Sequence, residues 1–165
     1  MPAGPVVAVI GGYDVGADVL AVAEEVGRRL AEAGAVVVTG GRRGVAEAAS
    51  RGAALAGGTV VGVLPGRDRA EANPWVGVAV PTGMGETRNA LVVMGADAVV
   101  ALPGSFGTLS EMAFALLAGT PVVGIGTWEL RPPGGGEDPV IRADDAEAAA
   151  TLAVELARAA GGRSE

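Results

Sequence analysis

The chain has 165 residues, half of them hydrophobic, which suits one domain with its own core. It contains no cysteine and no histidine, and all twelve of its basic residues are arginines. These absences exclude disulfides, thiolate or imidazole metal sites, Ser-His-Asp catalysis and a pyridoxal phosphate Schiff base. The formal charge of −7 argues against a nucleic-acid partner, and no apolar run is long enough to span a membrane. The first residues lack a secretory signal, so we expect a soluble cytoplasmic protein without metal or cofactor.

Apolar runs alternate with helical periodicity along the chain. Strands are expected at Val6–Ile10, Ala35–Val38, Thr59–Val63, Val76–Val80, Ala98–Leu102 and Pro121–Ile125. Helices are expected at Val15–Leu30, after Gly44 to about Ala56, at Gly85–Gly95, at Leu109–Ala118 and from Asp144 to about Ala160. Residues 65–74 and 131–139 are expected to form loops, and 161–165 a frayed tail. This order predicts an α/β fold: a single Rossmann-like three-layer domain over residues 1–165, with a central parallel sheet.

Four glycine-bearing turns follow predicted strands, and in such sheets ligands bind beyond the carboxyl ends of the strands. The turns are Gly11-Gly12, residues 40–44, residues 81–85 and residues 103–108. In the last turn, glycines allow a ligand to approach the backbone and the start of the next helix favours an anion. Ser105 and Thr108 could add hydroxyl donors. Tight packing of the strand against the helix is the alternative reason for the same glycines.

The other glycine turns are less specific. Residues 11–16 are only loosely similar to a dinucleotide fingerprint, and Thr39 stands where a ribose-binding acid is expected, so we reject classical NAD binding. Residues 39–44 form a second turn at a helix start, which suits a ribose, a base or a phosphate. Its two arginines, Arg42 and Arg43, have solvation as their alternative explanation.

Glu111 is the one charged residue between Gly107 and Thr120, in a helix that is otherwise nearly apolar on every side. A buried carboxylate needs a partner or a task. One task is catalysis. The alternative is capping, because Thr108 and Glu111 have the spacing of a capping box.

Arg88 shares a predicted helix face with Leu91 and Val92. An arginine on an apolar stripe is typical of pairing with a carboxylate or a phosphate. The sequence therefore predicts either a ligand-binding arginine or a structural ion pair with Glu86 or Asp97.

Together these stretches resemble the LOG (Lonely Guy) family, once labelled "possible lysine decarboxylase". Residues 40–46 read GGRRGVA where the family has a GGRxGVM-like turn, and residues 103–111 read PGSFGTLSE where it has PGGxGTxxE. Arg88 lies fifteen residues before Pro103, at the place of the family's catalytic arginine. Residues 82–89, TGMGETRN, look most like the short bacterial branch that includes molybdenum-cofactor carrier proteins. Ser105 and Ala46 depart from the family's glycine and methionine, and Ser105 either crowds the phosphate cradle or adds a donor to it.

The resemblance implies a phosphoribohydrolase that cleaves AMP or an N6-substituted AMP to free base and ribose 5-phosphate, without a metal. In that reading Glu111 stabilises the oxocarbenium-like state and activates water, while Arg88 orients Glu111 or neutralises ligand charge. A lysine decarboxylase is excluded, because pyridoxal phosphate chemistry needs a lysine. The residues expected to bind phosphate or nucleotide are Gly11, Gly12, Gly40, Gly41, Arg42, Gly44, Thr82, Met84, Asn89, Gly104, Ser105, Gly107 and Thr108.

Two other functions compete with hydrolysis. The first is a non-catalytic carrier of a phosphorylated ligand, such as molybdenum cofactor or a nucleotide. The second is a structural or regulatory oligomer with a vestigial pocket. Residues 84–94 and the Leu109–Ala118 helix offer more apolar surface than one sheet face can cover. We therefore expect a homodimer or a dimer of dimers, and the resemblance implies sites near the subunit boundary.

Overall fold

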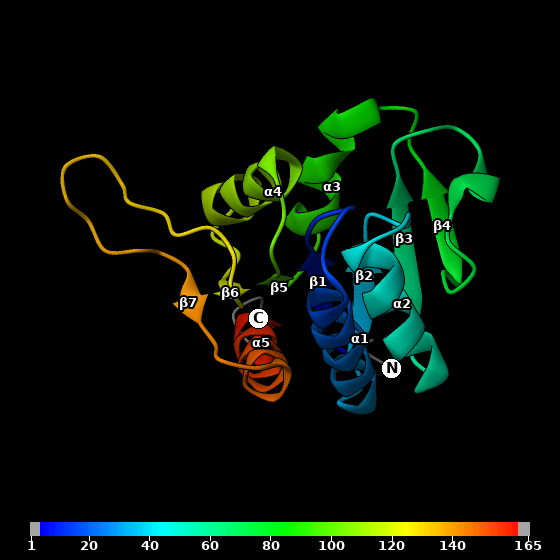
Figure 1. Cartoon of the computed structure of the whole chain (residues 1–165), viewed down its shortest axis with the longest axis horizontal. Coiled ribbons are helices and arrows are strands. Elements are labelled where there is room, and N and C mark those ends of the chain that lie inside the picture. Colours follow the sequence, from blue (N-terminus) through cyan, green and yellow to red (C-terminus); the bar gives the residue numbers. More distant parts are fainter. Residues whose placement is uncertain (1–3, 162–165) are drawn as a thin grey trace.

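The computed structural model describes residues 4–161, which form a seven-stranded sheet with all strands parallel (Figure 1). The strand order is β4-β3-β2-β1-β5-β6-β7. The strands are β1 (Val6–Ile10), β2 (Val36–Thr39), β3 (Val60–Leu64), β4 (Val78–Pro81), β5 (Ala98–Ala101), β6 (Val122–Gly124) and β7 (Ile141–Arg142). All six predicted strands are present, with ends that differ by about two residues at most. The two-residue β7 was not predicted.

Helices cover both faces of the sheet. One face carries α1 (Ala17–Glu32), α2 (Val45–Leu55) and α5 (Ala146–Gly161), and the other carries α3 (Asn89–Met94) and α4 (Phe106–Leu117) (Figure 1). Side chains of β1 alternate between the two cores: Val7 and Val9 pack with the α1, α2 and α5 side, and Ala8 and Ile10 with the α3 and α4 side. The predicted α/β, Rossmann-like three-layer fold is confirmed.

The strand order places a crevice beside β1. The chain runs outward from β1 to β4 and then returns to add β5 on the other side of β1. Ligands of open α/β sheets bind where the strand order reverses in this way. The turns after β1 and β5 meet there, since the Gly12 N–H donates to the Pro103 carbonyl at 2.9 Å.

Three predicted boundaries need correction. Helix α4 begins at Phe106 rather than Leu109, because the extended backbone of Ser105 forms the N-cap and residues 106–108 are already helical. The predicted helix at residues 85–95 starts as a 3-10 turn, η2 (Gly85–Arg88), before α3. Gly161, expected in a frayed tail, closes α5, and the remainder of that tail lies outside the described residues.

Two expected loops also contain short regular elements or border them. The loop at residues 65–74 includes a 3-10 turn, η1 (Arg69–Glu71), capped by the Asp68 carboxylate, which accepts from the Ala70 N–H at 2.9 Å. Residues 131–139 form the predicted loop, which extends away from the body of the molecule and leads into β7 (Figure 1). Within residues 4–161, no helix is long and apolar enough to cross a bilayer.

Candidate functional site

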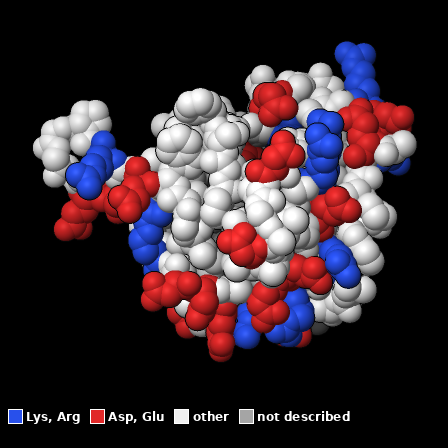
Figure 2. All heavy atoms as spheres, viewed as in Figure 1, with Lys and Arg blue, Asp and Glu red and all other residues white. Residues whose placement is uncertain are grey.

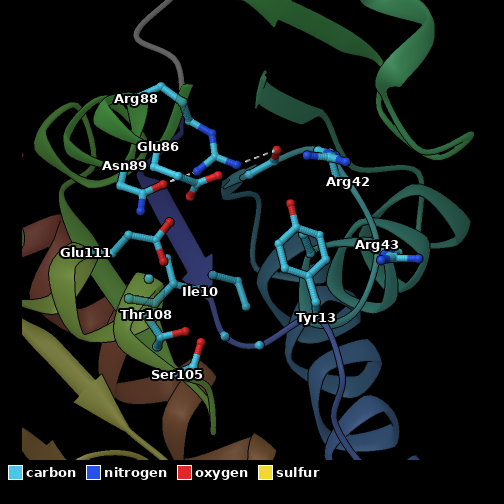
Figure 3. Close-up of a pocket in the computed structure, with 16 residues that line it drawn as sticks. Ile10, Tyr13, Arg42, Arg43, Glu86, Arg88, Asn89, Ser105, Thr108 and Glu111 are labelled. Atoms are coloured by element: carbon cyan, nitrogen blue, oxygen red, sulfur yellow. Dashed lines mark hydrogen bonds between the residues drawn. The ribbon is translucent and has the colours of Figure 1, made fainter. Parts of the chain in front are cut away.

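A pocket lies at the carboxyl edge of the sheet, in the crevice between β1 and β5 (Figure 3). It holds about 540 Å³ of empty space, open solvent at its mouth included. Its walls are the turns after β1 and β2, the segment from η2 into α3, and the first two turns of α4. The pocket therefore joins segments from four separate parts of the chain.

Most of the predicted site residues line this pocket. Those that do are Gly11, Gly12, Gly40, Arg42, Arg88, Asn89, Ser105, Gly107, Thr108 and Glu111. Those that do not are Gly41, Gly44, Thr82, Met84 and Gly104. Lining residues that sequence reasoning did not select are Val9, Ile10, Tyr13, Arg43, Ala46 and Glu86.

The three glycines outside the pocket serve the packing of its turns. Gly41 and Gly44 have positive φ, at 76° and 73°, which other residues adopt only with strain. A Cβ on Gly41 would lie 2.7 Å from the Leu64 side chain, and one on Gly44 would lie 2.6 Å from the Tyr13 Cα. A Cβ on Gly104 would lie 2.8 Å from the Gly12 nitrogen. These positions exclude side chains so that the turns can approach one another.

Thr82 and Met84 belong to the turn after the edge strand β4. The Thr82 hydroxyl donates to the Leu64 carbonyl at 2.7 Å and accepts from the Met84 N–H at 3.2 Å, so it closes that turn. The Met84 side chain is half exposed. These two residues therefore do not line the pocket but support the start of η2, and their contact with a ligand stays a prediction.

Arg88 is 5% exposed and points into the pocket (Figure 3). Its guanidinium donates to the Asn89 Oδ1 and, at 3.5 Å, to the Gly40 carbonyl. Its Nε is buried without a hydrogen-bond partner among the described residues. No carboxylate in residues 4–161 lies within 4.0 Å of it, and Asp97 instead accepts the Val6 N–H at 2.8 Å. The structural ion pair is therefore not formed.

Glu111 projects from the second turn of α4 toward the same pocket and is 7% exposed. Because Ser105 is the N-cap and Thr108 is already inside the helix, the capping-box interpretation of Thr108 and Glu111 is wrong. Burial raises the pKa of Glu111 to about 8; the Arg88 charge opposes this rise and the Glu86 charge adds to it. At neutral pH the Glu111 carboxyl is thus mostly protonated.

The start of α4 forms the wall below Glu111. Ser105 has φ −100° and ψ −153°, extended backbone that any residue adopts, so a serine fits at this position without strain. No side chain caps the helix, which leaves the N–H groups of its first turn open on the side where Ser105, Gly107 and Thr108 line the pocket. Free N–H groups and the helix dipole together favour an anion.

The opposite wall carries positive charge and an aromatic ring. The guanidiniums of Arg42 and Arg43 each lie 5.6 Å from the centroid of the Tyr13 ring. The position of Tyr13 directly after Gly11-Gly12, at the end of β1, was the signal for its place in the pocket. The loop residue Asn73 holds this wall in place, since its Nδ2 donates to the Arg42 carbonyl at 2.7 Å.

The charge of the pocket differs from that of the whole chain. Acidic side chains gather over α1 and α5 (Figure 2), where Arg28 and Arg29 are paired with Glu25. In the described part of the chain, the pocket arginines Arg42, Arg43 and Arg88 have no carboxylate within 4.0 Å. Three unpaired arginines and an open helix start make this part of an acidic protein suited to an anion.

Comparison with known proteins shows similarity along nearly the whole chain. The sequence model of the SLOG cluster4 family matches residues 4–159. An uncharacterized protein of Archaeoglobus fulgidus is 37% identical over 127 residues, which are 77% of this chain and 80% of that protein. The molybdenum cofactor binding protein from Rippkaea orientalis has a TM-score of 0.80 and 32% identity, over 90% of this chain and 94% of its own. The molybdenum cofactor carrier protein from Chlamydomonas reinhardtii has a TM-score of 0.80 and 31% identity, over 94% of this chain and 99% of its own.

Proposed function

The chain belongs to the SLOG cluster4 family, and we propose that it is a carrier that binds a small phosphorylated ligand of the molybdenum-cofactor type, a phosphorylated pterin. The observation that carries this proposal is the buried Arg88 guanidinium, whose Nε has no partner in the described chain, in one pocket with the open start of α4. Similarity to two proteins whose names state that they bind or carry molybdenum cofactor supports this choice of ligand.

The phosphate of the ligand is assigned to the start of α4. There it accepts from first-turn N–H groups and from the hydroxyls of Ser105 and Thr108, and the Arg88 guanidinium supplies a charge-assisted hydrogen bond. A protonated Glu111 does not repel this anion, whereas an ionised one does. The raised pKa of Glu111 therefore suits a pocket for an anionic ligand at neutral pH.

Trp128 offers a direct measure of binding. Its Nε1 donates to the Gly104 carbonyl at 3.1 Å. The centroid of its ring lies 5.8 Å from that of Phe106, at the start of α4. The chain has two tryptophans, so a Trp75→Phe background leaves Trp128 as the reporter. We expect freshly released molybdenum cofactor to change this fluorescence saturably, with inorganic phosphate as a weak competitor.

The matched variants are Arg88→Ala and Arg131→Ala, the second in the exposed loop away from the pocket. Loss of a charged hydrogen bond corresponds to roughly 1.5–3 kcal/mol, or about 10- to 150-fold in affinity. We expect that loss for Arg88→Ala alone. Equal affinities of the two variants, or no saturable change with any phosphorylated ligand, contradict the proposal.

Phosphoribohydrolase activity is a second candidate, favoured by the shared pocket of Arg88 and Glu111. A carboxyl with a pKa of about 8 is protonated at neutral pH and can donate a proton to a departing base, so an acid role fits better than water activation. The test is incubation with AMP and an N6-substituted AMP, followed by chromatography for free base and ribose 5-phosphate. Released base that disappears in Glu111→Gln establishes the enzyme; ligand binding without release supports the carrier.

We also propose that the chain is a homodimer or a dimer of dimers. Helices α3 and α4 pack together and leave large apolar side chains in solvent. These are Leu91, Met94, Phe106 and Leu117, with exposures of 47%, 54%, 78% and 82%. Burial of such a surface against a second copy is favourable.

A further inference from the structure

Tyr13 is unusual in its placement. The chain has only five aromatic residues, two Trp, one Tyr and two Phe. Within the described residues 4–161, Tyr13 is the aromatic side chain that lines the pocket, and it is 40% exposed there. A large ring left half in solvent at a binding pocket gives up burial that a core position would supply. Contact with a ligand therefore explains the position of the Tyr13 ring better than a contribution to the fold does.

The backbone around Tyr13 is fixed from two sides. The Gly12 N–H donates to the Pro103 carbonyl at 2.9 Å, and the Gly12 carbonyl accepts from the Val45 N–H at 3.0 Å. Gly44 packs against Tyr13 so closely that a Cβ there would lie 2.6 Å from the Tyr13 Cα. The ring is consequently carried on a turn that is tied to both the α4 side and the α2 side of the pocket.

Two cations accompany the ring. Arg42 and Arg43 each hold a guanidinium 5.6 Å from its centroid, and neither has a carboxylate within 4.0 Å in the described chain. Cation–π attraction restrains the tyrosine, and the unpaired guanidiniums keep their charge for a ligand. Figure 3 shows Tyr13 on the opposite side of the pocket from Ser105, Thr108 and Glu111.

We propose that Tyr13 is the stacking surface for the planar heterocycle of the ligand, and that it makes the pocket select ring-bearing phosphates over ring-free ones. This inference rests on the proposed function, because it assigns the phosphate to the α4 wall and the ring to the Tyr13 wall. Purines and pterins are both flat and have π-faces, so tyrosine accepts either without base-specific hydrogen bonds. Tyr13 is thus a determinant of ligand class.

The test uses calorimetry on wild type, Tyr13→Phe and Tyr13→Leu. The probes are two ring-bearing phosphates, AMP and 6-hydroxymethylpterin phosphate, and the ring-free ribose 5-phosphate. Stacking on an aromatic side chain contributes about 1–3 kcal/mol per base, which is roughly 5- to 150-fold in affinity. We expect Tyr13→Leu to lose that factor for a ring-bearing phosphate and to bind ribose 5-phosphate unchanged. Tyr13→Phe should keep the wild-type preference.

Three results overturn the stacking role and leave the phosphate site intact. In the first, wild type binds ring-bearing and ring-free phosphates equally well. In the second, Tyr13→Leu weakens the affinity for both classes by the same factor. In the third, Tyr13→Phe loses as much affinity for ring-bearing phosphates as Tyr13→Leu does, which assigns recognition to the hydroxyl. Failure of the proposed function has a different signature, since wild type then binds none of the three phosphates. That last result overturns the stacking role as well.

Discussion

Glu111 makes the stability of this protein depend on pH in a direction opposite to that of most carboxylates. Burial raises its pKa from the ordinary 4.5 to about 8. Between these values the native state holds a proton that the unfolded state has released, so the free energy of unfolding falls as pH rises. The slope is about 1.4 kcal/mol per pH unit, or about 4 kcal/mol between pH 5 and pH 8. For a domain of ordinary stability that is a large fraction of the total.

The variant Glu111→Gln isolates this contribution, because glutamine keeps the shape and is neutral at every pH. Urea unfolding followed by far-UV circular dichroism at pH 5, 6, 7 and 8 gives the free energy for both proteins. We expect the free energy of unfolding of the variant, relative to that of wild type, to rise by up to about 4 kcal/mol from pH 5 to pH 8. Glu155→Gln, at an exposed position of α5, is the matched control and should follow wild type.

A constant difference between Glu111→Gln and wild type from pH 5 to pH 8 refutes this reasoning. It would mean that the Glu111 carboxyl is ionised in the native state across the range, with its charge balanced by Arg88. A neutral Glu111 would then no longer explain why the pocket accepts an anionic ligand. The same outcome would restore the water-activating role that the sequence resemblance implies.

Three further predictions concern the ligand, the turns and the assembly. Calorimetric affinity for a phosphorylated ligand should fall as pH rises from 7 to 9, because Glu111 ionises with a pKa of about 8, and Glu111→Gln should remove the dependence. Gly41→Ala should cost at least about 1 kcal/mol more in urea unfolding than Gly57→Ala; both glycines have positive φ, at 76° and 78°, yet only Gly41 has neighbours within 4 Å. Light scattering at micromolar concentration should give a dimer or tetramer, and a monomer there contradicts the proposed assembly.

The fold was predictable because apolar residues follow one another continuously in its buried strands and recur at helical spacing in its helices. A continuous apolar run such as Val6–Ile10 indicates a buried parallel strand, and the structure places this strand, β1, at the centre of the sheet. The start of α4 was misplaced since periodicity begins at Leu109, whereas the true boundary depends on the backbone angles of Ser105. The two-residue β7 is too short to show any pattern of apolar residues, and only its pairing with β6 defines it.

The candidate site was predictable at the level of turns but not of side chains. Parallel strands end at one edge, so the turns at residues 11–12, 40–44 and 103–108 had to approach one another. Which glycine faces a ligand and which faces another turn depends on packing, and Gly104 illustrates the second case. Glu86 was not selected as a lining residue, and for Arg43 the sequence left ligand contact and solvation as alternatives; both line the pocket.

Net charge is a poor guide to this pocket, since charge acts over short distances at physiological salt. The carboxylates of α1 pair with neighbouring arginines on the surface, as Glu25 does with Arg28, and such pairs contribute nothing to the net charge of −7. In the pocket, burial suppresses the charge of Glu111, and Arg88 keeps a buried N–H without a partner. An unmade hydrogen bond of this kind costs the free protein about 1–3 kcal/mol. An anion that supplies the missing acceptor recovers that energy, and an acidic protein can therefore bind an anionic ligand specifically.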